Sequence, residues 1–134
     1  MKCNTDFLIV AYIVTMFVDW VFQAQWQAMH KSKWGKDDCR WISLAALLTH
    51  SIIYAGVSVC IIHIIYSQLS VSLMFWCLFL SHAIIDTRIP VKFILKLKGM
   101  SDEQISDTVN YGFMHIGIDH RLHELTLLVL SFFV

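Results

Sequence analysis

The sequence has 134 residues, of which 57% are hydrophobic and 15% are charged. Soluble domains average about 45–50% apolar and about 25% charged residues, so this composition favours a membrane protein. Ten basic residues balance ten acidic ones, which argues against a bulk attraction to nucleic acid. With one proline and five glycines, the chain has little room for linkers, and we expect a single domain over residues 1–134.

The chain is expected to form an all-α bundle of four transmembrane helices. Residues 6–29 form the first apolar segment, which we interpret as a retained helix because Asp19 interrupts the apolar run and no signal-peptide cleavage site follows. After a polar connector over residues 30–40, the second helix is expected over residues 41–66. The uncharged turn at residues 67–70 leads to the third, residues 71–95, which Pro90 would kink or end.

The last helical stretch is expected over residues 102–134. Ser101 and Gln104 have the spacing of a capping box, which predicts a helix start near Asp102. Residues 111–134 are long enough to span a bilayer, but only the half after Leu125 is strongly apolar. A bend near Gly112 and a re-entrant helix therefore both remain open.

Basic residues predict the orientation. Eight of the ten Lys and Arg lie in or beside the connector after the first segment and the one after the third. By the positive-inside rule these connections are cytoplasmic and both termini lie outside. Four cysteines (Cys3, Cys39, Cys60 and Cys77) have no short spacing, and we expect free thiols.

Ionisable residues inside the apolar segments carry the functional signal. His82 and Asp86, and likewise Asp119 and His123, are four residues apart, so each pair shares one helix face. If the two helices are antiparallel, the two Asp residues meet at one level. At ~1.5 Å per residue, six residues fall about 10–18 Å below the cytoplasmic surface. The six are Asp19, His50, His82, Asp86, Asp119 and His123.

Three uses of this Asp/His set remain open. Imidazole and carboxylate groups suit a divalent metal such as Zn, Mn or Fe. They also suit a proton relay or hydrogen bonding that only holds helices together. We favour metal binding, because ionisable residues inside membranes are usually functional. Four more residues are candidates for orienting the ligands or the substrate, namely Gln23, His115, His120 and Glu124.

Three residues are candidates for contacting a substrate. Arg88 either extends to the membrane surface or binds a phosphate group, for which a guanidinium is well suited. Arg121 is a second candidate for binding negative charge. Tyr54 has a hydroxyl that is able to donate to a leaving oxygen.

The motifs together resemble a family of small bacterial and phage inner-membrane proteins, domain of unknown function 3307. The resemblance covers nearly the whole chain. It rests on Asp19-x-x-x-Gln23, Lys31 or Lys33, His50 with Tyr54, His82-x-x-x-Asp86 with a basic residue two positions on, and Asp119-x-x-x-His123. Family members often carry His where this chain has Thr15, and Gln where it has His120. The resemblance implies that His120 or His115 replaces the missing ligand.

The constellation is also similar, more distantly, to membrane-bound metal-dependent hydrolases. We therefore expect a hydrolase of the bacterial inner membrane that acts on a phosphate ester or lipid headgroup. The alternatives are a non-enzymatic scaffold or interaction protein, in a bacterial or phage-encoded chain, and a transporter of protons or divalent metal. The expected partners are the lipid bilayer and either a second copy or another membrane protein.

Overall fold

The computed structural model describes residues 3–31 and 40–133, and all regular structure in these ranges is helical. Lys33, Cys39 and the rest of residues 32–39 lie outside the described residues. The helices are α1 (Thr5–Val21), α2 (Gln25–His30), α3 (Arg40–Ile65), α4 (Val71–Asp86), α5 (Ile89–Leu97), α6 (Asp102–Ser106) and α7 (Thr108–Leu130). The expected all-α class is confirmed. Cys3, Cys60 and Cys77 are free, as predicted.

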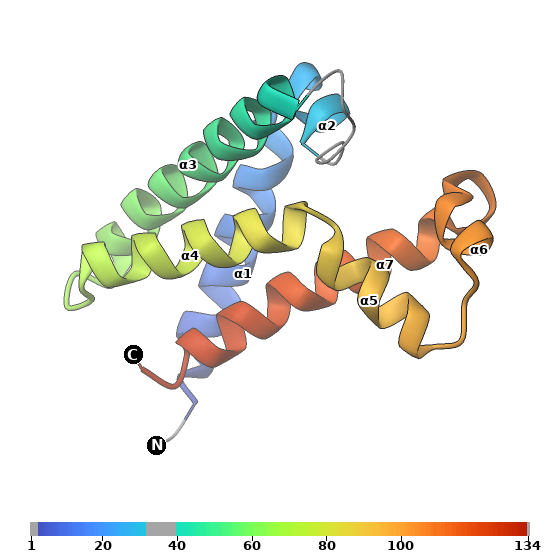
Figure 1. Cartoon of the computed structure of the whole chain (residues 1–134). Coiled ribbons are helices and arrows are strands. Elements are labelled where there is room, and N and C mark those ends of the chain that lie inside the picture. Colours follow the sequence, from blue (N-terminus) through green and yellow to red (C-terminus); the bar gives the residue numbers. More distant parts are fainter. Residues whose placement is uncertain (1–2, 32–39, 134) are drawn as a thin grey trace.

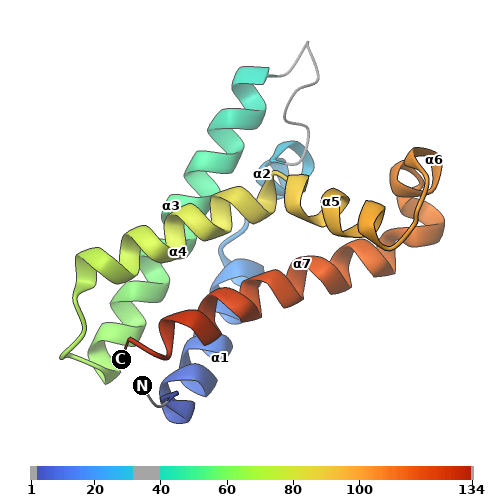
Figure 2. The same ribbon diagram turned by 60° about the horizontal axis from the view of Figure 1, so that its bottom comes forward.

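Four long helices form the bundle. Helix α1 packs on α3 and α7, and α4 packs on the same two helices from the other side. Figure 1 shows α3 and α4 as a hairpin, with α7 running antiparallel to α4. The two ends of the chain lie close together in both views (Figures 1 and 2), and the Asn4 N–H donates to the Ser131 carbonyl over 3.0 Å.

In the described part of the chain, α3 is the one helix long and apolar enough to cross a membrane by length and composition. Half of its apolar window is buried, and the core helix of a soluble protein has the same properties. Helix α1 has 17 residues, about 25 Å, which is shorter than a bilayer core of about 30 Å. The four-span arrangement therefore stays a prediction.

The first expected helix, residues 6–29, is broken in the structure. Helix α1 ends at Val21 and α2 begins at Gln25. The side chain of Gln27 accounts for the break, because its Oε1 accepts from the Ala24 N–H over 2.8 Å and its Nε2 donates to Thr49 Oγ1 over 3.2 Å. This buried amide starts a new helix and attaches it to α3.

The later helices follow their local signals. Helix α3 matches the expected 41–66 within one residue, and the capping box of Ser101 and Gln104 starts α6 as predicted. Helix α4 ends at Asp86. Pro90 lies four residues later and has no N–H to donate to the Asp86 carbonyl. Helix α7 is continuous through Gly112, so the bend that the sequence left open at this position is absent. The helical stretch is interrupted instead at Asp107, whose carboxylate accepts from the amides of Val109 and Asn110.

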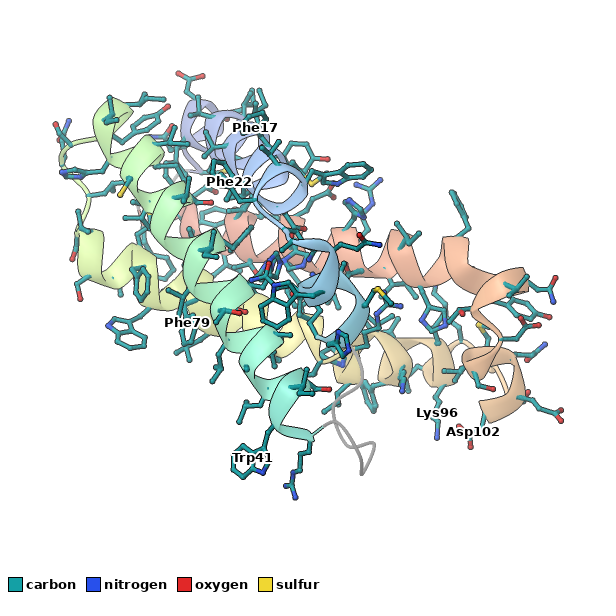
Figure 3. The ribbon with its side chains drawn as sticks, turned by 90° about the horizontal axis from the view of Figure 1, so that it is seen from above. Phe17, Phe22, Trp41, Phe79, Lys96 and Asp102 are labelled. Carbon is teal, nitrogen blue, oxygen red and sulfur yellow. The ribbon has the colours of Figure 1, made fainter. Side chains whose placement is uncertain are left out.

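Two apolar clusters lie at opposite ends of the molecule. The larger one packs between the four long helices and includes Phe7, Val59 and Leu78. The smaller joins α5, α6 and α7 through Val91, Leu95 and Ile105. Figure 3 shows Trp41 extending away from the end of α3, and Lys96 of α5 beside Asp102 of α6, where the two form an ion pair. Along α4, α5 and α7 the polar candidates lie between the two clusters.

Candidate metal centre

The first group of candidate ligands brings together three helices. Asp19 of α1, His50 of α3 and His82 of α4 each place one ligand atom within 4.8 Å of the others. His50 Nε2 lies 2.9 Å from Asp19 Oδ1 and 2.9 Å from His82 Nε2. His82 Nε2 lies 3.8 Å from Asp19 Oδ1. Both imidazoles are buried, so three residues far apart in sequence share one interior point.

The second group adjoins the first. Asp86 of α4 and Asp119 and His123 of α7 also place ligand atoms within 4.8 Å of one another. The His82 and His123 rings are 4.6 Å apart between centroids. Helices α4 and α7 run antiparallel (Figure 1), which is the condition under which the two spacings bring Asp86 and Asp119 together. Asp86 Oδ2 connects the groups, at 3.2 Å from His82 Nε2 and 3.5 Å from His50 Nε2.

Hydrogen bonding alone does not satisfy His50. Its Nε2 faces the Asp19 oxygen and the His82 nitrogen, and also Gln23 Nε2 at 3.2 Å. A neutral imidazole nitrogen either donates one hydrogen or accepts with its lone pair. If it donates to Asp19, it faces the Gln23 N–H without a lone pair to offer. If it accepts from Gln23, its lone pair points toward the carboxylate oxygen.

A divalent cation between these atoms would accept the lone pairs of both Nε2 atoms and of the carboxylate oxygens at the same time. Ligands that bind a metal at about 2.0–2.1 Å lie roughly 2.9–3.4 Å from each other in octahedral or tetrahedral geometry. Three of the distances from the two Nε2 atoms to each other and to the carboxylate oxygens, 2.9, 2.9 and 3.2 Å, lie in this range. The other two, 3.5 Å from His50 to Asp86 and 3.8 Å from His82 to Asp19, are slightly longer. Imidazole nitrogens with carboxylate oxygens form a donor set suited to Zn, Mn or Fe. The residues therefore fit a metal ion.

One feature differs from a finished metal site. Metal-bound imidazoles usually donate their other ring N–H to an acceptor, which fixes the ring. The Nδ1 atoms of His50 and His82 are buried and have no hydrogen-bond partner within residues 3–31 and 40–133. Packing holds His82 instead, because the Tyr54 ring stacks on it at 3.7 Å between centroids and 17° between planes.

Lys31 is the site residue that residue spacing did not identify. Its Nζ lies 2.9 Å from Asp86 Oδ2, and both side chains are largely buried. On a straight helix Lys31 would lie about 18 Å beyond Asp19, far from the cluster. The break between α1 and α2 brings it back. The only signal in the sequence was the family resemblance, which pointed to Lys31 or Lys33.

Three residues expected to orient the ligands have other contacts. His115 is buried and its Nε2 donates to the Ile105 carbonyl over 3.0 Å, which joins α7 to α6. His120 donates from Nδ1 to Ile116 of its own helix. Glu124 pairs with Arg121. His120 and Glu124 also line the small cavity beside Asp19, Asp119 and His123, so their predicted role in orienting ligands or substrate stays a prediction. His115 instead joins α7 to α6, whereas Gln23 contacts the candidate ligand His50.

The substrate candidates differ in position. Arg88 is half-buried in the connection between α4 and α5, and its side chain has no hydrogen bond or ion pair within the described ranges. Its charge acts on both Asp119 and His115. Tyr54 lines a small cavity together with Thr15, Asp19, Asp119 and His123. Thr15, where the resembling family often has His, thus lies beside the candidate ligands.

No family model, curated protein or solved structure matches this chain in sequence or fold comparisons. The resemblance to the small inner-membrane family therefore rests on the residues quoted for it. Function has to be argued from the geometry of the Asp/His groups themselves.

Proposed function

We propose that the protein is a metal-dependent hydrolase of a phosphate ester or lipid headgroup, built as a four-span bundle in a bacterial inner membrane. The convergence of His50 Nε2, His82 Nε2, Asp19 Oδ1 and Asp86 Oδ2 carries the proposal. Intracellular basic loops would place this site in the cytoplasmic half of the bilayer. The resemblance to small inner-membrane and phage proteins supports the same location.

The surface supports membrane insertion. Large apolar side chains are exposed along all four long helices, for example Ile13, Trp41, Ile64, Leu73 and Phe113. Soluble monomers rarely expose contiguous apolar patches above a few hundred Å². Contact with lipid tails would cost these side chains no free energy, whereas contact with water would be unfavourable.

Each residue has a role that follows from its position. Asp19, His50 and His82 would hold one ion, and Asp86, Asp119 and His123 a second ion or a proton. A bound divalent ion would polarise the phosphoryl oxygen and activate water. Arg88, which has no partner in the described part of the chain, would bind the negative charge of the substrate. The Tyr54 hydroxyl lines the cavity and would donate to the leaving oxygen.

Elemental mass spectrometry of detergent-purified protein tests the metal. We expect about one or two equivalents of a transition metal in the wild type and a loss of at least about tenfold in His82→Ala/Asp119→Ala. His63→Ala/Asp102→Ala removes the same residue types outside both groups and should keep its metal. If all three proteins are folded and none contains metal, the hydrolase proposal is wrong.

A non-enzymatic scaffold is the second candidate, and the Lys31–Asp86 pair favours it. This pair neutralises one buried carboxylate without any metal, and the unpartnered Nδ1 atoms are unusual for metal ligands. On this reading, apolar residues at positions 82 and 86 would preserve function. Transport is less well supported, because the larger apolar cluster fills the other half of the bundle.

A further inference from the structure

An open groove runs along the outer surface between α1 and α7. Leu8, Ile9 and Tyr12 line it from α1, and Arg121, Glu124, Leu125 and Leu128 line it from α7. Its volume is about 460 Å³, within the range of about 300–1,000 Å³ typical of small-molecule sites. Most of the lining is aliphatic, with the charged pair on one wall.

This groove adjoins the small interior cavity beside the candidate metal centre. Tyr12 and Glu124 line both the groove and the small interior cavity. That cavity is also lined by Asp19, Asp119 and His123. A ligand in the groove would therefore keep its apolar part outside the bundle and direct its polar end toward the Asp/His groups.

Arg121 and Glu124 suggest what the polar end carries. They form an ion pair, and the Arg121 side chain is 80% exposed. Charged groups are unfavourable when they face hydrocarbon alone, so a polar partner in the groove would stabilise them. A guanidinium binds phosphate through paired N–H groups, and the Glu124 carboxylate would then be free to face the cavity.

We propose that the α1–α7 groove binds an acyl chain of a bilayer phospholipid, with the phosphate near Arg121 and the labile ester near the cavity. This inference rests on the proposed hydrolase function and names its substrate class, a glycerophospholipid of the cytoplasmic leaflet. Leu8 and Leu128 lie toward the ends of the chain, so the acyl chain would run from Arg121 toward the part of the bundle where both termini lie.

Native mass spectrometry of the full chain in detergent tests the groove without requiring catalysis. The delipidated protein is titrated with 1-palmitoyl-2-oleoyl phosphatidylglycerol. Ile9→Trp/Leu125→Trp fills the groove at side chains that are 54% and 53% exposed and lie outside the larger core cluster. Ile13→Trp/Leu80→Trp is the matched control, at side chains that are 61% and 52% exposed and do not line the groove.

We expect one retained phospholipid per chain in the wild type and the control, and at least about tenfold weaker retention in the groove variant. Equal retention in all three proteins would overturn the proposal. So would a wild-type dimer that becomes a monomer in the groove variant without losing lipid, because a second copy would then cover the groove. Metal content is measured on the same samples. If the protein contains metal but lipid retention is the same in the groove variant, the groove proposal alone is wrong. If lipid retention depends on the groove but no protein contains metal, the hydrolase proposal alone is wrong.

Discussion

The Nε2 atoms of His50 and His82 lie 2.9 Å apart, and both face the Asp86 carboxylate oxygen, at 3.5 and 3.2 Å. That oxygen is also 2.9 Å from the Lys31 ammonium. The Asp86 carboxylate therefore lies close to both the buried Lys31 ammonium and the two imidazoles. Because Lys31 and a metal ion would compete for Asp86, this lysine decides between the structural and the catalytic interpretation.

Removing Asp86 should destabilise the fold, because it leaves the largely buried Lys31 ammonium without a partner. Breaking a buried pair from one side costs about 3–5 kcal/mol, whereas apolar replacement of both partners is often nearly neutral. We expect a large loss of thermal stability in Asp86→Ala and recovery of most of it in Lys31→Met/Asp86→Leu. Thermal unfolding in detergent measures both. Equal losses in the two variants would show that Lys31 and Asp86 are not coupled.

Lys31→Met should strengthen metal binding by at least about tenfold, because two charges at close range interact by about 1–4 kcal/mol at effective dielectric constants of 80 to 20. Calorimetric titration with Zn²⁺ or Mn²⁺ measures the affinity. Lys96→Met is the control, since Lys96 forms an exposed ion pair with Asp102 far from the Asp/His groups and should leave the affinity unchanged. Weaker metal binding in Lys31→Met would mean that Lys31 supports the site.

Short-range patterns in the sequence predicted much of this arrangement. The four-residue spacing of His82 and Asp86, and of Asp119 and His123, is fixed by helix geometry. Their convergence also followed from the expectation of antiparallel helices. Pro90 and the capping box at Ser101 act within a few residues, so the helix end and the helix start that they cause were also predictable from the sequence.

Features set by tertiary contacts were not predictable in this way. The break after Val21 depends on Gln27, which accepts from the Ala24 N–H and reaches Thr49 of α3. With Ala24 rather than Ser, Thr, Asp or Asn at the N-cap position, Gln27 alone does not mark a helix start. Lys31 enters the site only because of that break. His115 lies four residues before Asp119 and so on the same helix face, but its Nε2 donates to the Ile105 carbonyl of the short helix α6.

Helix α7 should lose its N-terminal cap in acid. Hydrogen bonds from the Asn110 side chain and from the Asn110 and Val109 amides hold the pKa of Asp107 below its usual range. Because the folded-state pKa is depressed, the cap contributes stability above the ordinary carboxyl pKa and loses it as pH falls through the folded value. We expect faster amide exchange at Val109 and Asn110 in that range, measured by hydrogen exchange. Asp107→Asn retains a capping side chain and should remove the pH dependence.

Tyr54 should act on His82 mainly through its ring. Tyr54→Ala removes the stacked ring and leaves a core cavity, for which we expect a loss of about 3–5 kcal/mol, as for other large aromatic residues. Tyr54→Phe keeps the stacking and should retain the metal. If the hydroxyl donates to a leaving oxygen, Tyr54→Phe lowers kcat about 10²-fold or more without changing metal content. Unchanged kcat would leave Tyr54 as a positioning residue.

Arg88 combines an unfavourable backbone conformation with a charged side chain that has no partner among the described residues. Substitution by glycine and by alanine separates the effects of these two properties. Its φ of 60° lies in the left-handed region, which costs a residue with a Cβ roughly 1–2 kcal/mol and glycine little. Arg88→Gly should therefore be more stable than Arg88→Ala by about 1 kcal/mol in thermal unfolding.

Both variants lack the guanidinium, and both should raise KM for a phosphate ester by a similar factor if Arg88 binds the substrate. Lys92→Ala, on the neighbouring helix α5, is the control for loss of a positive charge and should have a smaller effect. An unchanged KM in Arg88→Gly would show that the arginine does not bind substrate. Equal stability of the glycine and alanine variants would show that the backbone at position 88 relaxes when the arginine is removed.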